Sequence, residues 1–208
     1  MKLQDIIILR ESLGWQPGSY VEVKDEFLTV LYKGYPLSKT GESITISFLK
    51  LLPMNETWKM TTTPSGNWRD LHYDDSKWID VDLSDPNMQL TGNMFFRKVF
   101  KGDNGFAAYE ARISYNDGAL MFLNGMEIFR DNMPEGPITP EMNATKHNLT
   151  PSFMGVIRNF LEVNNGANVL AVELHYKDVE VLRNVTFNGM ISAFPSNVKD
   201  QSICFGLV

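Results

Sequence analysis

The sequence predicts an all-β protein built as a sandwich of sheets. Most of its apolar residues fall in short β-prone runs, and Gly, Pro, Asn or Asp residues separate these runs. The clearest turn signal is Asn124-Gly125, which stands between the runs 119–123 and 126–129. Both central residues of a type I′ turn need positive φ, which Asn tolerates and Gly adopts freely. We therefore predict a β-hairpin over 119–129.

Further strands are predicted along the whole chain. Three short runs in the N-terminal part are bounded by Pro, Gly or charged residues; they are 19–23, 27–32 and 43–49. Later runs alternate between apolar and polar residues, which is typical of strands with one face in a core. These runs are 95–100, 107–115, 168–176 and 185–194. Many short strands with regular turn signals are typical of a β-sandwich.

The alternation also predicts which residues share a face. In 95–100 one side holds Phe96, Lys98 and Phe100, and the other holds Phe95, Arg97 and Val99. In 168–176 the apolar side holds Leu170, Val172, Leu174 and Tyr176, and the opposite side holds Val169, Ala171, Glu173 and His175. Helix signals are poor. The best is at 155–163, where we predict a short helix that ends at Asn164-Asn165-Gly166.

The chain is predicted to have three parts. A break near Leu51–Pro53 separates a small N-terminal β element, 1–52, from a sandwich over 53–196, and a tail follows over 197–208. A β element of this size needs a neighbour to dock on, because it buries too little apolar surface alone.

Composition excludes several function classes. The chain has 208 residues, of which 43% are hydrophobic and 21% charged, as in ordinary soluble domains. A net charge of -6 and the lack of any basic block argue against a nucleic-acid partner. No apolar run is long enough to insert into a membrane. The single cysteine, Cys204, excludes an internal disulfide and a cysteine-based zinc site.

Four glycosylation sequons of the N-x-S/T type bear on the compartment. They begin at Asn55, Asn143, Asn148 and Asn184. They favour an extracellular or cell-surface protein, which is our prediction. The apolar stretch near residue 1 is too short for a signal peptide, so a cytoplasmic location stays open.

Four motifs resemble a known kind of module. They are "YDDSKW" (73–78), "FFRKVF" (95–100), "YNDGALMFLNGMEIFRDNMPEGPIT" (115–139) and "GANVLAVELHY" (166–176). Their order is similar to that in galactose-binding-like jelly-roll modules of large secreted proteins and, more loosely, to the sugar-binding domain of β-galactosidases. The resemblance covers about Thr57 to Phe194. It implies a jelly-roll β-sandwich, and it is not specific for a ligand.

The N-terminal segment 11–28, "ESLGWQPGSYVEVKDEFL", resembles a second extracellular element, the "DSYGDGWNG" β-module of secreted eukaryotic proteins. Leu13 and Gln16 stand where that module has Gly-Asp and Asn neighbours. A cation site of that module is therefore not expected here.

Turn chemistry explains several polar residues without a substrate. In 73–78 we expect Asp74, Asp75 and Ser76 to shape a turn that anchors Trp78. Two acidic pairs, Asp74/Asp75 and Asp117/Glu127, also permit a glycosidase interpretation, in which two carboxylates flank the scissile bond. Nothing marks either pair as a general acid, and no G-x-S-x-G motif is present. We predict no catalytic residues and no enzyme activity.

Calcium is the one cofactor that the resemblance implies. Jelly-roll modules of this kind often hold Ca²⁺ between loops through carboxylate and backbone oxygens. The resemblance makes Asn116, Asp117 and Glu173 the candidate ligands. The alternative is that these side chains only form hydrogen bonds within the protein.

The predicted ligand-binding residues are the polar ends of the hairpin and of 168–176. A sugar site needs an aromatic platform and polar side chains that bind hydroxyl groups. The candidates are Arg130, Asp131, Asn132, Glu173, His175 and Tyr176, with Tyr73 and Tyr115 as further platforms. Trp58, Trp68 and Trp78 are expected to anchor the sandwich instead.

The resulting hypothesis is a non-catalytic binding module, carbohydrate-binding or adhesive, within a larger extracellular or surface protein. The alternative is a structural or assembly subunit that docks on neighbouring protein domains through a sandwich face and has no glycan ligand. An exposed aromatic patch would favour the glycan, and a broad flat apolar patch would favour a protein partner.

Overall fold

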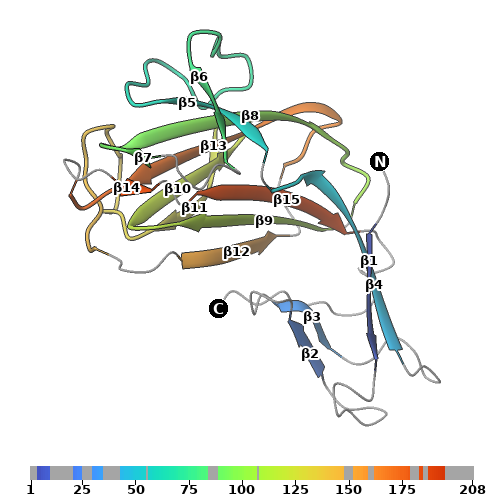
Figure 1. Cartoon of the computed structure of the whole chain (residues 1–208). Coiled ribbons are helices and arrows are strands. Elements are labelled where there is room, and N and C mark those ends of the chain that lie inside the picture. Colours follow the sequence, from blue (N-terminus) through green and yellow to red (C-terminus); the bar gives the residue numbers. More distant parts are fainter. Residues whose placement is uncertain are drawn as a thin grey trace.

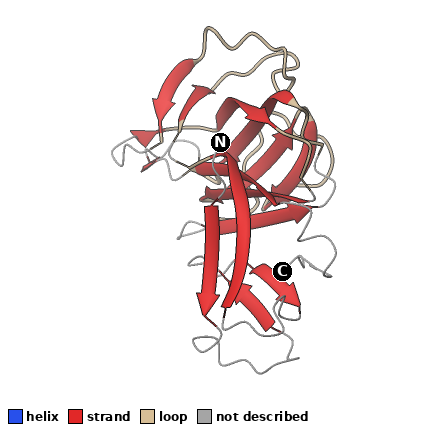
Figure 2. Cartoon of the chain, turned by 90° about the vertical axis from the view of Figure 1, so that its right-hand side faces the viewer, coloured by secondary structure: helices blue, strands red, loops and turns tan. Residues whose placement is uncertain are grey.

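The fold is known from a computed structural model. It describes residues 4–9, 21–24, 30–34, 43–54, 56–83, 89–106, 108–147, 152–158, 162–178, 183–184 and 187–194. Every strand pairing in this part of the chain is antiparallel. The described residues contain no helix, and hence none long and apolar enough to cross a membrane (Figure 2).

Two antiparallel sheets form the main body of the molecule (Figure 1). The six-stranded sheet has the order β11 (Met126–Asp131), β10 (Gly118–Leu123), β13 (Gly166–His175), β8 (Met94–Gly102), β5 (Thr57–Thr61) and β6 (Ile79–Asp82). The five-stranded sheet has the order β1 (Gln4–Leu9), β4 (Ser43–Leu52), β15 (Asn188–Phe194), β9 (Ala108–Tyr115) and β12 (Ser152–Arg158). The predicted all-β sandwich is confirmed.

Two short ladders complete the described strands. They pair β2 (Val21–Lys24) with β3 (Val30–Gly34), and β7 (Gln89–Leu90) with β14 (Arg183–Asn184). In Figure 1 the β2–β3 ladder lies beyond the sandwich, at the far end of β1 and β4. The predicted boundary at residue 52 falls at the end of β4, whose residues Leu49 to Leu52 pair with β15. The division into 1–52, 53–196 and 197–208 stays a prediction.

The hairpin predicted from Asn124-Gly125 is confirmed. Asn124 has φ 51° and Gly125 has φ 85°, as a type I′ turn requires. The Asn124 side chain also ties the turn to its neighbour, because it donates to the Asn168 amide oxygen (2.9 Å) and accepts from the Val169 N–H (3.0 Å). A β-bulge follows, since Met121 is opposite Phe129 while Phe122 is opposite Glu127.

The predicted helix at 155–163 is wrong. Residues 155–158 belong to β12, which pairs with β9 over its whole length, so that Val156 is opposite Ala111. Val156 and Ile157 are β-branched, and the partner strand supplies backbone hydrogen bonds that the local apolar spacing does not reveal. Residues 162–163 are not helical either, and 159–161 lie outside the described residues.

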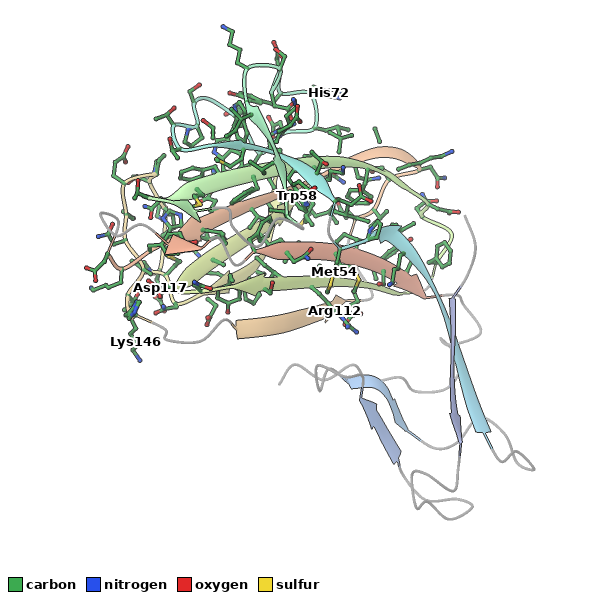
Figure 3. The ribbon with its side chains drawn as sticks, viewed as in Figure 1. Met54, Trp58, His72, Arg112, Asp117 and Lys146 are labelled. Atoms are coloured by element: carbon green, nitrogen blue, oxygen red, sulfur yellow. The ribbon has the colours of Figure 1, made fainter. Side chains whose placement is uncertain are left out.

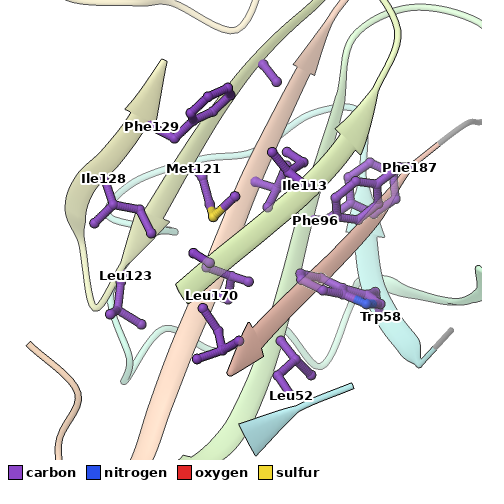
Figure 4. Close-up of a cluster of buried hydrophobic side chains, with 14 of the residues drawn as sticks. Leu52, Trp58, Phe96, Ile113, Met121, Leu123, Ile128, Phe129, Leu170 and Phe187 are labelled. Atoms are coloured by element: carbon purple, nitrogen blue, oxygen red, sulfur yellow. The ribbon is translucent and has the colours of Figure 1, made fainter. Parts of the chain in front are cut away.

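The core lies between the two sheets. The predicted apolar face of β13 is confirmed, because Leu170, Val172, Leu174 and Tyr176 all belong to the buried cluster. The rings of Phe96 and Phe187 pack in a tilted arrangement with their centroids 4.6 Å apart, and Trp58 meets Phe187 edge-on at 5.1 Å (Figure 4). Trp58 is therefore an anchor of the sandwich, as predicted.

A second apolar cluster covers the opposite side of the six-stranded sheet, which we call the outer face. The segment 62–78, between β5 and β6, folds over this face; His72 marks it in Figure 3, on the side of the molecule away from Arg112 of the other sheet. Trp68 packs against Trp78 (5.7 Å) and Phe95 (5.6 Å). The expected turn is present, because Ser76 N–H donates to Asp74 (3.0 Å) and Trp78 N–H to the Asp75 carbonyl (3.0 Å).

Candidate functional site

The strand register places the polar residues of β11 and β13 on the outer face. Leu120 of β10 is opposite both Arg130 and Glu173, so these three side chains form one row across three strands. Phe122 is opposite both Glu127 and Ala171, which form the next row. Residues opposite each other in a sheet project to the same side. The hairpin and β13 thus share a face, as the binding hypothesis required.

This face is covered at its centre. Glu173 is 1% exposed and His175 is 0% exposed. His175 Nδ1 donates to the Met142 carbonyl (2.7 Å), and His175 Nε2 lies 3.0 Å from Glu173 Oε2. The imidazole ring also meets Phe95 edge-on at 5.8 Å. A ligand therefore cannot reach His175 directly, and the side chain fixes the Glu173 carboxylate.

Arg69 completes the cluster and was not predicted from the sequence. It comes from the segment 62–78 and donates to Glu173 Oε1 through Nε (2.7 Å) and through Nη2. Its guanidinium lies over the rings of Phe122 (4.4 Å) and Trp68 (5.1 Å), where a cation is attracted to the π-system. The side chain keeps 33% of its surface exposed. Arg69 is thus the accessible member of the hydrogen-bonded series His175–Glu173–Arg69.

Arg97 has a different role on the same face. It is 1% exposed and donates to Asp75 (2.9 Å) and to the carbonyls of Trp68, Asp70 (2.9 Å) and Tyr73 (3.5 Å). These contacts pin the segment 62–78 to the sheet. The Asp74/Asp75 pair is therefore engaged in turn and anchoring contacts. Hydrogen bonds from Ser76 hold the pKa of Asp74 below its usual value.

Arg130 is also committed to the protein itself. It forms a two-point ion pair with Glu127 (2.9 and 2.7 Å), and its Nη1 donates to the carbonyls of Pro134 (2.6 Å) and Gly136 (2.9 Å). Glu127 is the main cause of a raised pKa at Arg130. Arg130 remains a predicted ligand-binding residue, but its visible contacts clamp the loop that follows β11.

Asp131, Asn132 and Tyr176 do not join Arg130 on the outer face. Asp131 accepts from the buried Tyr115 hydroxyl (2.6 Å), and burial together with this contact raises the pKa of Tyr115. Asn132, with φ 52°, donates to the carbonyls of Asp117 (2.6 Å) and Lys146 (2.8 Å), which lie at one end of the sandwich (Figure 3). Tyr176 is 2% exposed in the core. Tyr115 and Tyr176 are hence not exposed platforms.

The candidate calcium ligands lie in two separate groups of contacts. Asp117 is buried, accepts from Lys177 N–H (2.9 Å) and lies 3.1 Å from His147 Nδ1. Glu173 faces Arg69 and His175 instead. A hard cation needs several oxygen ligands, whereas these carboxylates face nitrogen donors. Within the described ranges no three His, Cys, Asp or Glu side chains are placed to share a metal ion. The Asn116, Asp117 and Glu173 site stays a prediction that these contacts do not favour.

Two of the four sequon asparagines are described residues. Asn143 is exposed in the segment between β11 and β12, and its amide donates to the Lys177 carbonyl (3.2 Å). Asn184 is in β14. Asn55 and Asn148 lie outside the described residues. Glycosylation at all four stays a prediction.

The chain was compared with known proteins. No protein-family model matches it, and no curated protein matches it. The similar solved structures include a β-glucuronidase of an uncultured Clostridium species, with a TM-score of 0.46 and 13% identity over 79% of this chain and 31% of the other. They also include Bacteroides uniformis β-glucuronidase 2 bound covalently to cyclophellitol-6-carboxylate aziridine, with a TM-score of 0.44 and 15% identity over 72% and 18%.

A glycosyl hydrolase family 2 member from Bacteroides cellulosilyticus is similar to the same extent, with a TM-score of 0.45 and 13% identity over 67% of this chain and 20% of the other. The chain spans less than a third of the length of each of these glycosidases. Identities and TM-scores of this size assign neither a family nor an activity to the chain.

Proposed function

We propose that the chain is a non-catalytic binding module for a glycan, recognised on the outer face around Arg69. The observation that carries this proposal is the state of the Arg69 guanidinium. A guanidinium has five N–H donors. Glu173 takes the Nε donor and one Nη2 donor, and Nη1 has no hydrogen-bond partner among the described residues. Arg69 therefore presents oriented donors at a partly exposed position, as recognition of hydroxyl or acidic groups requires.

The absence of catalysis is part of the proposal, and the contacts of the carboxylates support it. A glycosidase acid must stay protonated, which needs an apolar pocket or a second carboxylate close by. Here Asp75 pairs with Arg97 and Glu127 pairs with Arg130. Asp117 faces His147 and a backbone N–H. His147 and Asp117 resemble the base and orienting acid of a triad, yet no described hydroxyl or thiol is hydrogen-bonded to His147.

Assembly or adhesion through protein partners is the second candidate function. The burial of the aromatic side chains favours this function, because a glycan site needs an exposed aromatic platform. Trp68, Trp78 and Phe122 are all under 9% exposed. Against it, the exposed large apolar residues among those described are Ile79, Val99 and Met126, which lie on three different strands. They do not form the broad patch that a stable protein interface would use. The exposed Asn143 sequon supports placing the module in an extracellular or surface protein.

A glycan array tests the proposal, run beside a pull-down from the surface fraction of the source organism. We expect glycan signals that Arg69→Lys removes, with affinities on the order of 0.1–1 mM because Trp68, Trp78 and Phe122 are buried and offer a sugar little apolar contact. Purified chain should release no product from panels of chromogenic glycosides, esters and phosphate esters. An empty array with specific protein partners would move the function to assembly. Turnover that disappears in Asp75→Asn, Asp117→Asn or Glu127→Gln would make the chain an enzyme.

A further inference from the structure

Among the described residues three arginines reach the outer face, and Arg69 keeps the most free donors. Arg97 uses its Nε donor, both Nη1 donors and one Nη2 donor. Arg130 likewise uses Nε, one Nη2 donor and both Nη1 donors. Arg69 uses only Nε and one Nη2 donor. Arg69 therefore keeps both Nη1 donors and one Nη2 donor, whereas Arg97 and Arg130 each keep a single Nη2 donor. Arg69 is thus the arginine of this face that can bind neighbouring groups of another molecule through several donors without losing a contact within the protein.

The position of Arg69 is set by buried groups. The carboxylate that holds it is 1% exposed, and that carboxylate is held by the fully buried His175, which is itself bound to the Met142 carbonyl. Desolvating such charged groups is unfavourable, so a buried ion pair is weak evidence for stability by itself. Its other consequence is orientation: the guanidinium is fixed at its Nε edge, over the Phe122 ring, with Nη1 unengaged. Such pre-organisation lowers the entropy lost on binding.

The charge around Arg69 is compensated or negative. Glu173 pairs with Arg69 and Glu127 with Arg130, while Glu135 also acts on Arg130. Arg97 is compensated by Asp75, so Arg69 and Arg130 are left facing three carboxylates. Asp70 adds a fourth beside the hairpin turn, where its Oδ1 would be 3.0 Å from a Cβ at Gly125. The local sum is negative whether or not His175 is charged, so an anionic ligand meets no net attraction.

The same arrangement suits hydroxyl groups. A hydroxyl both accepts and donates, so it binds best where a donor and an acceptor lie close together. Arg69 lies over Phe122, and Glu127 stands opposite Phe122 on the neighbouring strand with 37% of its side chain exposed. Arg69 Nη1 supplies the donor and the Glu127 carboxylate supplies the acceptor. Neighbouring hydroxyls of a sugar ring can engage both.

We infer that Arg69 binds the hydroxyl groups of an uncharged sugar, with Glu127 as acceptor and with Glu173 and His175 as positioning residues that hold the guanidinium. This inference rests on the proposed function and deepens it by naming the ligand class. It excludes uronic acids and sulfated sugars as the preferred ligands.

The test is a glycan array with matched neutral, uronic-acid and sulfated members, followed by NMR titration of the strongest neutral and acidic oligosaccharides. We expect signals from neutral glycans, with Kd values that differ less than about twofold between about 0.05 M and about 0.5 M NaCl, since no net charge is neutralised. Arg69→Lys keeps a cation beside Glu173 but loses the planar fork, and should weaken binding at least about tenfold. The matched control is Lys59→Met, which should leave binding unchanged. Lys59 lies on the same outer face, and 30% of its side chain is exposed.

Glu173→Gln separates positioning from general structure. The amide keeps a hydrogen-bond acceptor for Arg69 but removes the charge that balances it, so acidic glycans should gain affinity relative to neutral ones. A purely structural Glu173 would change both classes alike. Should Glu173→Gln fail to fold, Glu127→Gln tests the charge balance from an exposed position. The amide keeps an acceptor for the sugar and removes one negative charge, so the preference should again shift toward acidic glycans, and an unchanged preference would overturn the inferred ligand class.

Three other results would each overturn a different part of the proposal. Preferential binding of acidic glycans by the parent chain, with affinity that falls as salt rises, overturns the inference and leaves the proposed glycan-binding function in place. Neutral binding that survives Arg69→Lys overturns the site. An empty array overturns the proposed function together with the inference.

Discussion

The Arg97 and Arg69 regions occupy the same face of the same sheet and use the same chemical group in opposite ways. Arg97 projects from β8 into the folded-over segment 62–78 and is 1% exposed. Arg69 projects from that segment back toward β13 and is 33% exposed. Arg97 belongs to the sheet and fastens the loop to it, whereas Arg69 belongs to the loop and is held in place by Glu173 of the sheet. An arginine on this face is therefore structural or available for recognition according to how many of its donors the protein itself uses.

The largest expected effect is at Arg97. Replacing it with Met leaves the Asp75 carboxylate and several backbone carbonyls without their donor, which should lower the free energy of unfolding by about 3–5 kcal/mol. Urea denaturation followed by tryptophan fluorescence measures this, because Trp68 and Trp78 belong to the same loop and are buried against the sheet. Lys59→Met, opposite Arg97 in the register, should change stability by less than about 0.5 kcal/mol. Equal losses of stability in the two variants would show that Arg97 does not hold the loop more firmly than a surface cation does.

A smaller loss is expected at the hairpin turn beside the loop. Gly125 has φ 85°, and a Cβ there would lie 3.0 Å from Asp70 Oδ1. Gly125→Val forces a β-branched residue into this conformation and should lower stability by about 1–3 kcal/mol. Thermal unfolding measures the change. Since Asp70 follows Arg69, the variant should also weaken glycan binding; unchanged binding would show that the turn does not influence the Arg69 region.

Arg69→Lys should have little effect on stability. The ammonium can still pair with the buried Glu173 carboxylate, so no charge is left unpaired and stability should change by no more than about 1 kcal/mol. The comparison is sharpest in one pair of measurements: chemical denaturation for stability and NMR titration for binding. Arg69→Lys should lose binding and keep stability, whereas Arg97→Met should lose stability first. If Arg69→Lys lowered the free energy of unfolding by several kcal/mol, Arg69 would be a structural arginine that holds the loop, as Arg97 is.

The smallest effect concerns Asp74, at the turn that Arg97 holds. Its pKa is lowered in the folded state from 3.8, chiefly by hydrogen bonds from Ser76. A lowered folded pKa means a contribution to stability that is complete above pH 3.8 and is lost as the pH falls through the folded value. The difference in stability between the parent and Asp74→Asn should therefore shrink as the pH falls below 3.8 toward the folded pKa of Asp74. A difference that grows toward low pH would contradict the assigned turn contacts.

Much of the fold was predictable because its signals are local. The hairpin followed from two residues whose φ preferences match one turn type, and both φ angles agree. The faces of β8 and β13 followed from alternation, and so did the shared side of Glu173 and His175. The predicted helix at 155–163 failed because a partner strand, β9, decided the conformation there. The predicted loop chemistry of Asp74, Ser76 and Trp78 is confirmed by their contacts.

The candidate site was only half predictable. The sequence named Arg130 and Glu173 as parts of one site on the condition that the hairpin and the strand 168–176 share a face, and the structure meets this condition by placing both strands beside β10. It did not show that Glu173 and His175 are covered, that Tyr115 and Tyr176 lie in the core, or that Arg69 meets Glu173. Arg69 and Glu173 are 104 residues apart, and only a loop folded onto the sheet brings them together. The sequence around Arg69 carries no sign of this beyond a Trp-Arg pair after a Gly-Asn turn.

The sequence alone therefore determined the hairpin turn and the two sides of strands such as β8 and β13, because backbone sterics and the two-residue period of a strand act over a few residues. Only the tertiary structure decided which of those sides is open to solvent and which arginine keeps its donors free. The reason is physical: periodicity specifies which side chains share a face, whereas burial and hydrogen-bond saturation depend on segments distant in the chain that pack over that face.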